Sequence, residues 1–396
     1  MTVIFYLLVC MSQYTPIQKA KNPDHIYYDL TIRNFQSTTR EIQHLRFNES
    51  RSIPYVPNAS EYVLSIVRFT LDTFSLPTFT ADIEPNQGDP DLMIQSVTLE
   101  YDDGVNPPVW FRQILRWVPS ISIPTPAAPN TTPTGYQVNS AYYNAYSYQH
   151  VINICNTALS NAMTGLIALA PALAGVPAPF LAWSPESNTA SLYCRAAEFS
   201  NLASPRVNVY FDRAMYSLFN SFPTFRNSLT ETGGRIYRVL VSPAGGTNVI
   251  TNQQIFSNAP TIVIKQEYST ISVWQPVLQI VFTSNTLPIY PNQLSAPTIL
   301  ENGQIQNFSD SNANFANIIT DLSSFDQSMK PTLIYVPSAE YRRIDLQAVN
   351  QPLTNLDISV YYRDKNGRLN EFLFGSGASC SIKLLFEKKH LLKKTE

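Results

Sequence analysis

Two stretches near the N-terminal end of the chain decide its fold class: YYDLTIRNF at residues 27–35 and YVLSIVRFTL at residues 62–71. Both are rich in β-branched and aromatic residues and are bounded by Pro, Asn, Asp and Ser, which is the pattern of a β-strand between turns. The pattern recurs along the chain and predicts an all-β sandwich or barrel of about a dozen strands. The later strands are expected at residues 94–102, 109–118, 180–183, 190–194, 206–211, 235–241, 261–270, 277–284, 315–322, 332–337, 356–364, 369–374 and 381–389.

One stretch breaks the β pattern. Residues 139–170 contain no Pro, begin with a candidate N-cap at Asn139 or Ser140, and repeat apolar residues at helical spacing. They predict one amphipathic helix, which the Pro-containing run at residues 171–179 ends. The expected core positions of this helix are Val151, Ile154, Ala158, Leu159 and Ala162.

The chain has 396 residues, which allows one large β domain that carries an insertion. Its first eleven residues, MTVIFYLLVCM, are too short to span a bilayer and lack the basic start and cleavage site of a signal peptide. We therefore expect translation to start at Met11 and no membrane span, with a truncated signal peptide as the alternative. The expected divisions are an N-terminal arm at 1–25 (of which 1–10 are mis-started), a first barrel part at 26–135, a helix-containing insertion at 136–204, a second barrel part at 205–387 and a basic tail at 388–396.

Charge is scarce and nearly balanced. Only 14% of the residues are charged and the formal net charge is −2, so no global field recruits nucleic acid or an anionic membrane. A surface of amides and hydroxyls costs less to bury against a partner than a charged surface, which favours assembly. The exception is the C-terminal tail, for which solvation and contact with an acidic partner or nucleic acid are both open. Its basic residues are Lys388, Lys389, His390, Lys393 and Lys394.

No catalytic, cofactor-binding or metal-binding residue is predicted. The sequence lacks GxGxxG, P-loop, HExxH and GxSxG motifs. His150 and Cys155 form a His/Cys neighbourhood, but their spacing on a helix points a base and a nucleophile apart. The four cysteines have neither metal-ligand spacing nor the pattern of a disulfide framework. They are Cys10, Cys155, Cys194 and Cys380.

Several acidic residues sit in turn contexts, where Asp commonly caps backbone groups. Asp102 and Asp103 precede a Gly, and Asp89 and Asp91 flank a Pro. A weak calcium site formed by Asn86 with Asp89 and Asp91 is the alternative.

Four phrases of the sequence carry a family resemblance: YYDLTIRNFQSTT, YNAYSYQHVINICNTAL, FTSNTLPIYPNQLSAPTI and SIKLLFEKK. They resemble the minor capsid, or penton, proteins of the polinton, adintovirus and virophage-like group of DNA viruses and endogenous elements, over most of residues 25–389. The resemblance implies a single jelly roll with a small helix-containing insertion, distantly similar to the adenovirus penton base. No family site residue is carried over.

The same resemblance implies a role. The chain would be a structural protein of the virion without enzymatic activity, forming homopentamers at the vertices of an icosahedral capsid that encloses double-stranded DNA. Its partners would be further copies of itself, the major capsid protein and a host-cell receptor, with the basic tail as a weak candidate for genome contact. Because the sequence has no Arg-Gly-Asp tripeptide, receptor binding through integrins has no support.

Two other readings stay open. A major capsid protein with a double jelly roll is suggested by a faint echo between residues 65–79 and 279–293. A secreted β-sandwich that binds or hydrolyses carbohydrate is suggested by the apolar N-terminus and by sequons at Asn48, Asn58, Asn130 and Asn307. In a glycosidase, Glu100 and Glu267 are the acids to suspect as the catalytic pair.

Overall fold

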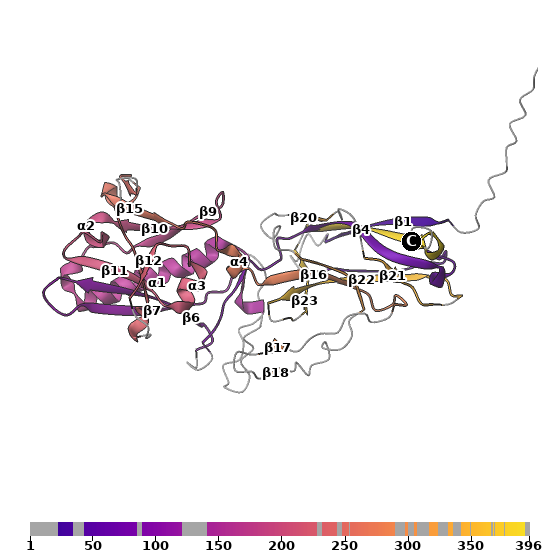
Figure 1. The fold of residues 1–396 in the computed structure, drawn as a ribbon, viewed down its shortest axis with the longest axis horizontal. Coiled ribbons are helices and arrows are strands. Elements are labelled where there is room, and N and C mark those ends of the chain that lie inside the picture. The colour runs from indigo at the N-terminus through magenta and orange to yellow at the C-terminus, as the bar shows by residue number, and fades with distance from the viewer. Residues whose placement is uncertain are drawn as a thin grey trace, which may run out of the picture.

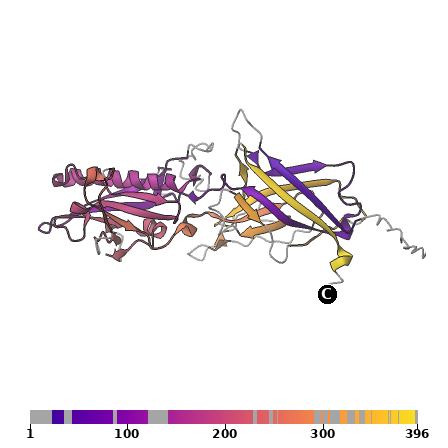
Figure 2. The same ribbon diagram turned by 90° about the horizontal axis from the view of Figure 1, so that it is seen from above.

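The structure is a computed structural model, and it has two lobes joined end to end along the long axis of the molecule (Figure 1). The view from above shows the same two lobes, with the long helix lying along one of them (Figure 2). The residues that the structure describes are 23–34, 43–84, 89–120, 141–227, 232–243, 248–252, 254–289, 298–299, 305–306, 317–323, 332–335, 342–348, 350–365, 367, 369–375 and 377–392.

One lobe consists of two antiparallel sheets that face each other. The first sheet has the order β1 (His25–Arg33), β25 (Ser379–Lys388), β4 (Tyr62–Asp72) and β20 (Thr332–Tyr335), with β21 (Ile344–Asp345) also on β4. The second has the order β19 (Ile318–Ser323), β16 (Val277–Thr283), β22 (Asn355–Asp364) and β23 (Leu369–Glu371), with β3 (Arg46–Ser50) also on β22. The eight main strands, numbered 1 to 8 along the chain, are β1, β3, β4, β16, β19, β20, β22 and β25. Their order is 1, 8, 3, 6 in the first sheet and, with β3 beside β22, 5, 4, 7, 2 in the second. This interleaving of Greek keys is a jelly roll.

The inward residues of both sheets form one hydrophobic core. In β25, Ile382, Leu384 and Phe386 point inward at every second position, because successive side chains of a strand face opposite sides. Smaller elements complete this jelly-roll lobe. They are β2 (Gln43–His44) paired with β24 (Leu373–Phe374), β17 (Thr298–Ile299) paired with β18 (Ile305–Gln306), η1 (Ala59–Glu61) and α5 (Lys389–Leu392).

The other lobe is built from a segment inserted between β4 and β16. A five-stranded sheet has the order β12 (Thr224–Arg226), β13 (Tyr237–Val239), β11 (Arg206–Phe211), β6 (Leu92–Asp102) and β7 (Val109–Arg116). A four-stranded sheet has the order β14 (Val249–Ile250), β15 (Thr261–Lys265), β10 (Thr189–Arg195) and β9 (Phe180–Ser184). The other elements are β5 (Phe79–Thr80) paired with β8 (Asn144–Ala145), α1 (Tyr148–Leu169), α2 (Ala196–Phe199), α3 (Arg213–Leu218), α4 (Ile271–Trp274), η2 (Ala141–Tyr143), η3 (Pro171–Leu173), η4 (Thr232–Gly234) and η6 (Phe256–Asn258).

Helix α1 packs against β6, β7 and β9, and all five apolar positions expected on its inner face are buried. It begins at Tyr148 after Ser147, later than expected, because the residues before it form η2 and β8. The N-cap expected at Asn139 or Ser140 is therefore wrong, and those two residues lie outside the described ones. By length and composition α1 is apolar enough to cross a membrane, but half of its apolar window is buried inside the protein, as in a core helix.

The expected division of the chain differs from the structure. One core takes its residues from Phe79 to Trp274, whereas the jelly-roll core takes them from Leu30 to Leu76 and from Val277 to Phe386. The insertion is therefore not a small unit at 136–204, because β6, β7, β11 and β13, expected in the barrel, belong to the same core as α1. Alternating apolar residues mark a strand but not its sheet, which is the physical reason for the difference. We call residues 79–274 the insertion lobe.

Candidate assembly surfaces

The His/Cys neighbourhood on α1 is a packing feature. Nε2 of His150 lies 2.7 Å from the carbonyl oxygen of Val118, and the imidazole packs edge-on against Trp117 with ring centroids 5.6 Å apart. Cys155 is fully buried in the insertion lobe, and burial raises the pKa of its thiol to about 12. The thiol is therefore protonated at neutral pH.

An arginine occupies the acidic turn considered for calcium. Nη1 of Arg116 lies 2.6 Å from Oδ2 of Asp89, and its Nη2 lies 3.6 Å from Oδ2 of Asp91. The hydroxyl of Tyr142 also donates to Asp91, at 3.1 Å. Asn86 lies outside the described residues, among which no group of three His, Cys, Asp or Glu side chains is placed to hold a metal ion.

The two glutamates suspected in the glycosidase reading are not brought together as a pair. Glu100 is buried on β6, where its carboxylate lies 2.6 Å from Nη1 of Arg235 and accepts hydrogen bonds from Tyr210 and Asn208. Glu267 is exposed and follows β15 in the other sheet. The charge of Glu100 is thus compensated within the five-stranded sheet.

The described part of the basic tail is paired with acidic residues of the same chain. Nζ of Lys388 lies 3.3 Å from Oδ1 of Asp24, and His390 lies 3.9 Å from the same oxygen. Nζ of Lys389 lies 3.8 Å from Asp345. The tail was expected to be solvated or to contact an acidic partner or nucleic acid, and its first residues lie in β25 and α5. Lys393 and Lys394 lie outside the described residues.

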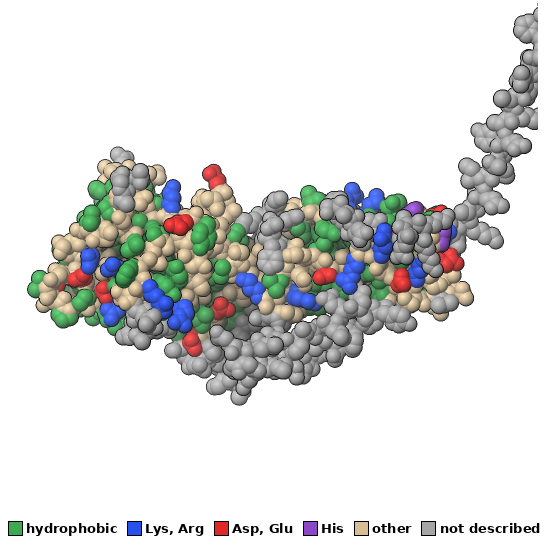
Figure 3. All heavy atoms as spheres, in the orientation of Figure 1, with side chains coloured by type: hydrophobic (Ala, Val, Ile, Leu, Met, Phe, Trp, Pro, Cys, Tyr) green, Lys and Arg blue, Asp and Glu red, His purple; other side chains and the backbone are tan. Residues whose placement is uncertain are grey.

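The jelly-roll lobe offers two flanks for contacts with neighbours. β1 and β20 are the opposite edges of one sheet, and each carries an exposed apolar side chain, Tyr27 on β1 and Ile334 on β20. Between these edges the surface is charged, because Asp29 lies 3.7 Å from Arg68 and 3.3 Å from Lys383. Figure 3 shows the mixture of charged, polar and apolar side chains on one face of both lobes.

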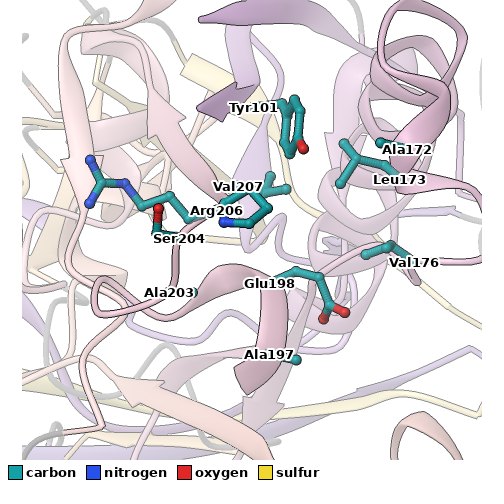
Figure 4. Close-up of a pocket in the computed structure, with 11 residues that line it drawn as sticks. Tyr101, Ala172, Leu173, Val176, Ala197, Glu198, Ala203, Ser204, Arg206 and Val207 are labelled. Carbon is teal, nitrogen blue, oxygen red and sulfur yellow. The ribbon is translucent and has the colours of Figure 1, made fainter. Parts of the chain in front are cut away.

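A pocket of about 450 Å³ lies in the insertion lobe beside α2, which Figure 1 shows toward the end of this lobe away from the jelly roll. Figure 4 shows Leu173 and Val176 on one side of it and Arg206 on the other, with the guanidinium directed away. That guanidinium pairs with Asp102, with Nη2 and Oδ2 2.9 Å apart, so its charge is already engaged. Beside the pocket, Leu202 is 79% exposed. The pocket wall is therefore of mixed polar and apolar character and is open to a partner.

The lobes are tied together around α4. The indole N–H of Trp274 donates to the carbonyl oxygen of Leu218 at 2.7 Å within the insertion lobe. From the jelly-roll side, Nζ of Lys365 donates to the carbonyl oxygen of Val273 at 2.5 Å. A cavity of about 580 Å³ lies beside this contact, lined by residues of both lobes. Lysine near the last carbonyls of a helix is a favourable arrangement.

The sequence analysis missed the residues of this junction. Asp82, Gln95 and Lys365 line one cavity although Lys365 is far from the other two in the chain. No motif in the sequence marks Asp82, Gln95 or Lys365 as part of a site. Only the fold brings them together.

Comparisons with known proteins identify relatives over nearly the whole chain. The family model described as Sputnik minor capsid protein V18/19 matches residues 26–388. Of two proteins of Sputnik virophage, "Uncharacterized protein V18" is 31% identical over 173 residues, 43% of this chain and 98% of its own length. "Structural protein V19" is 26% identical over 212 residues, 52% of this chain and 94% of its own length.

Two solved structures have a similar fold. A chain of the Sputnik virophage structure determined by cryo-EM at 3.5 Å resolution matches 93% of this chain and 99% of its own length, with 26% identity and a TM-score of 0.76. The crystal structure of the selenomethionine-labelled mavirus penton protein matches 92% of this chain and 100% of its own length, with 18% identity and a TM-score of 0.60.

Proposed function

Because this chain belongs to the family of Sputnik minor capsid proteins, it is a structural protein of a virion capsid, and we propose that five copies form each vertex of an icosahedral shell. The observation that carries the proposal is a single jelly roll with a large lobe inserted between its third and fourth strands, a fold shared with a protein named a penton. The chain acts through assembly and not through catalysis.

A closed ring requires two different, complementary surfaces on every copy. The opposite edges β1 and β20 of one sheet supply two such surfaces, with Tyr27 and Ile334 as apolar contacts 58% and 57% exposed. In the proposed ring, the β1 flank of one copy contacts the β20 flank of the next. Burying apolar side chains at the centre of such a contact is what stabilises an interface.

The further partners follow from this arrangement. Major capsid protein surrounds the ring of jelly rolls, and the insertion lobe, with its pocket, is available to a host-cell receptor. A double jelly roll does not fit, because in the described residues the jelly-roll strand order occurs once and the sheets of the insertion lobe have another order. The paired basic residues of the tail argue against the genome as its partner.

The test is the mass of the purified protein in solution, measured by mass photometry and checked by negative-stain imaging. One chain has a mass of 44.5 kDa, so a five-membered ring has a mass of about 220 kDa. Replacing either Tyr27 or Ile334 by Asp (Tyr27→Asp, Ile334→Asp) is expected to shift the measured masses from rings to single chains, because the substitution buries an unpaired charge in the interface.

The matched control is Val105→Asp, at an exposed position of the turn between β6 and β7, which is expected to leave the rings intact. Trimers would instead favour a major capsid protein. Single chains that persist at high protein concentration would contradict a self-assembling ring.

A further inference from the structure

One side of the pocket beside α2 is apolar and firmly held. Leu173 and Val176 line this side, and Val207 of β11 lies near them (Figure 4). The turn that carries Leu173 and Val176 is fixed by backbone hydrogen bonds, because the N–H of Leu173 donates to Ala170 and the N–H of Val176 donates to Leu173, each at 3.0 Å. A wall that is already ordered lowers the cost of binding a ligand with apolar C–H groups on one face.

Two hydroxyl groups of the pocket are open to a ligand. Among the described residues, neither the hydroxyl of Tyr101 nor that of Ser204 has a hydrogen-bond partner, and neither residue is buried. Figure 4 shows the Tyr101 hydroxyl directed into the space between its own ring and Leu173. Each hydroxyl can both donate and accept a hydrogen bond, so the pocket matches a ligand that itself carries hydroxyl groups.

The charged groups at the pocket are compensated from outside it. Nε of Arg195 donates to Oε2 of Glu198 at 2.6 Å, and its Nη2 donates to Oε1. The guanidinium of Arg206 pairs with Asp102 and is directed away from the pocket. Neither Arg195 nor Asp102 lines the pocket. A charged ligand would therefore find no uncompensated opposite charge, whereas a neutral ligand can still donate to the remaining lone pairs of the Glu198 carboxylate.

We propose that this pocket binds a neutral pyranose sugar. One C–H face of the ring lies against Leu173 and Val176, while its hydroxyls donate to the carboxylate of Glu198 and exchange hydrogen bonds with Tyr101. The volume of about 450 Å³ lies within the range of pockets that hold small molecules. The same ring occurs as a free sugar and as the terminal residue of a glycan. In the second case the inference rests on the receptor role proposed for the insertion lobe and names the receptor chemistry as carbohydrate.

The test is saturation-transfer NMR of the full chain with neutral methyl pyranosides, namely those of glucose, galactose, mannose and N-acetylglucosamine. N-acetylneuraminic acid is the anionic probe, and cyclohexanol is an apolar ring of similar size with a single hydroxyl. At least one neutral pyranoside is expected to bind, with the strongest saturation on the C–H protons of one ring face. The anionic sugar and cyclohexanol are expected to give no signal.

Two matched pairs of variants locate the site. Ala172→Trp places a large side chain on the pocket wall and is expected to abolish binding, whereas Ala174→Trp, at an exposed position of the same turn outside the wall, is expected to leave binding unchanged. Tyr101→Phe removes one hydroxyl and is expected to weaken binding about fivefold, the effect of one neutral hydrogen bond. Its control is Tyr268→Phe, at a tyrosine that is 59% exposed and does not line the pocket.

A trisaccharide that ends in the bound sugar separates the two sources. If it binds as tightly as the methyl pyranoside, a glycan is the occupant; if only the methyl pyranoside binds, the occupant is a small molecule. The proposal is overturned if none of the neutral pyranosides binds, if cyclohexanol or the anionic sugar binds as tightly, or if Ala172→Trp leaves binding unchanged. Mass photometry of the same samples shows independently whether the rings persist, so such a failure is distinguished from a failure of the vertex role.

Discussion

Asp357 is a buried carboxylate in β22 that holds the turn after β16 in place. Its Oδ1 accepts hydrogen bonds from the hydroxyls of Ser284 and Thr286 and from the backbone N–H of Thr286 at 2.8 Å. Its Oδ2 accepts from the backbone N–H of Asn285 at 2.9 Å. Burial alone would raise the pKa of Asp357, but these hydrogen bonds together lower it. We predict that Asp357→Asn strongly destabilises the jelly-roll lobe.

The magnitude follows from the four hydrogen bonds. An Asn side chain keeps one oxygen on the Ser284 and Thr286 side but turns its NH₂ group toward the N–H of Asn285. That loses one charge-assisted hydrogen bond, about 1.5–3 kcal/mol, and weakens the other three. We expect a total loss of about 3 kcal/mol in the free energy of unfolding. Asp345→Asn is the control, because Asp345 is 61% exposed in the same lobe and is expected to change stability by less than about 0.5 kcal/mol.

Urea unfolding followed by two signals locates the effect. Far-UV circular dichroism reports both lobes, whereas fluorescence reports the insertion lobe, which contains all four tryptophans. We expect Asp357→Asn to shift the jelly-roll transition and leave the fluorescence midpoint in place, since two separate cores need not unfold together. The tryptophans are Trp110, Trp117, Trp183 and Trp274.

The pH dependence has a definite sign. Because the folded-state pKa of Asp357 is lowered, its contribution is fully present above the unfolded-state value of about 3.9 and is lost as the pH falls through the folded-state value. The difference between wild type and Asp357→Asn is thus expected to be constant from neutral pH to about pH 5 and to shrink below about pH 4. An effect no larger than that of Asp345→Asn, or one that grows toward low pH, would refute this reasoning.

Three further predictions concern the insertion lobe. Gly165→Ala places a Cβ 2.5 Å from ring carbons of Phe111 and is expected to lower the free energy of unfolding by about 1 kcal/mol, after the gain in helix propensity is counted. In a Phe111→Leu background, urea unfolding is expected to show that the same substitution raises the free energy of unfolding instead. Arg235→Met leaves the buried carboxylate of Glu100 uncompensated and is expected to lower the stability measured by fluorescence by about 3 kcal/mol, an expectation that an unshifted midpoint would contradict. In a chain whose Cys10, Cys194 and Cys380 are replaced by Ala, the thiol of Cys155, whose pKa burial raises to about 12, is expected to react with Ellman's reagent only on unfolding, so rapid labelling of that native chain would rule out the buried position.

Local structure was largely predictable from the sequence. The inner face of α1 and the strands β9 and β10 formed where the residue pattern indicated. These features depend on the spacing of residues within one element. The resemblance to minor capsid proteins, carried by strand phrases, was confirmed by the family match.

The sequence by itself thus determined which segments are strands, where the long helix lies and which of its faces is apolar. Only the tertiary structure decided which strands share a core, that the jelly roll closes from residues 25–76 and 277–388, and that Asp82, Gln95 and Lys365 line one cavity. The physical reason is that periodicity records whether a side chain faces inward, whereas the identity of the surface that it faces depends on contacts between residues hundreds of positions apart.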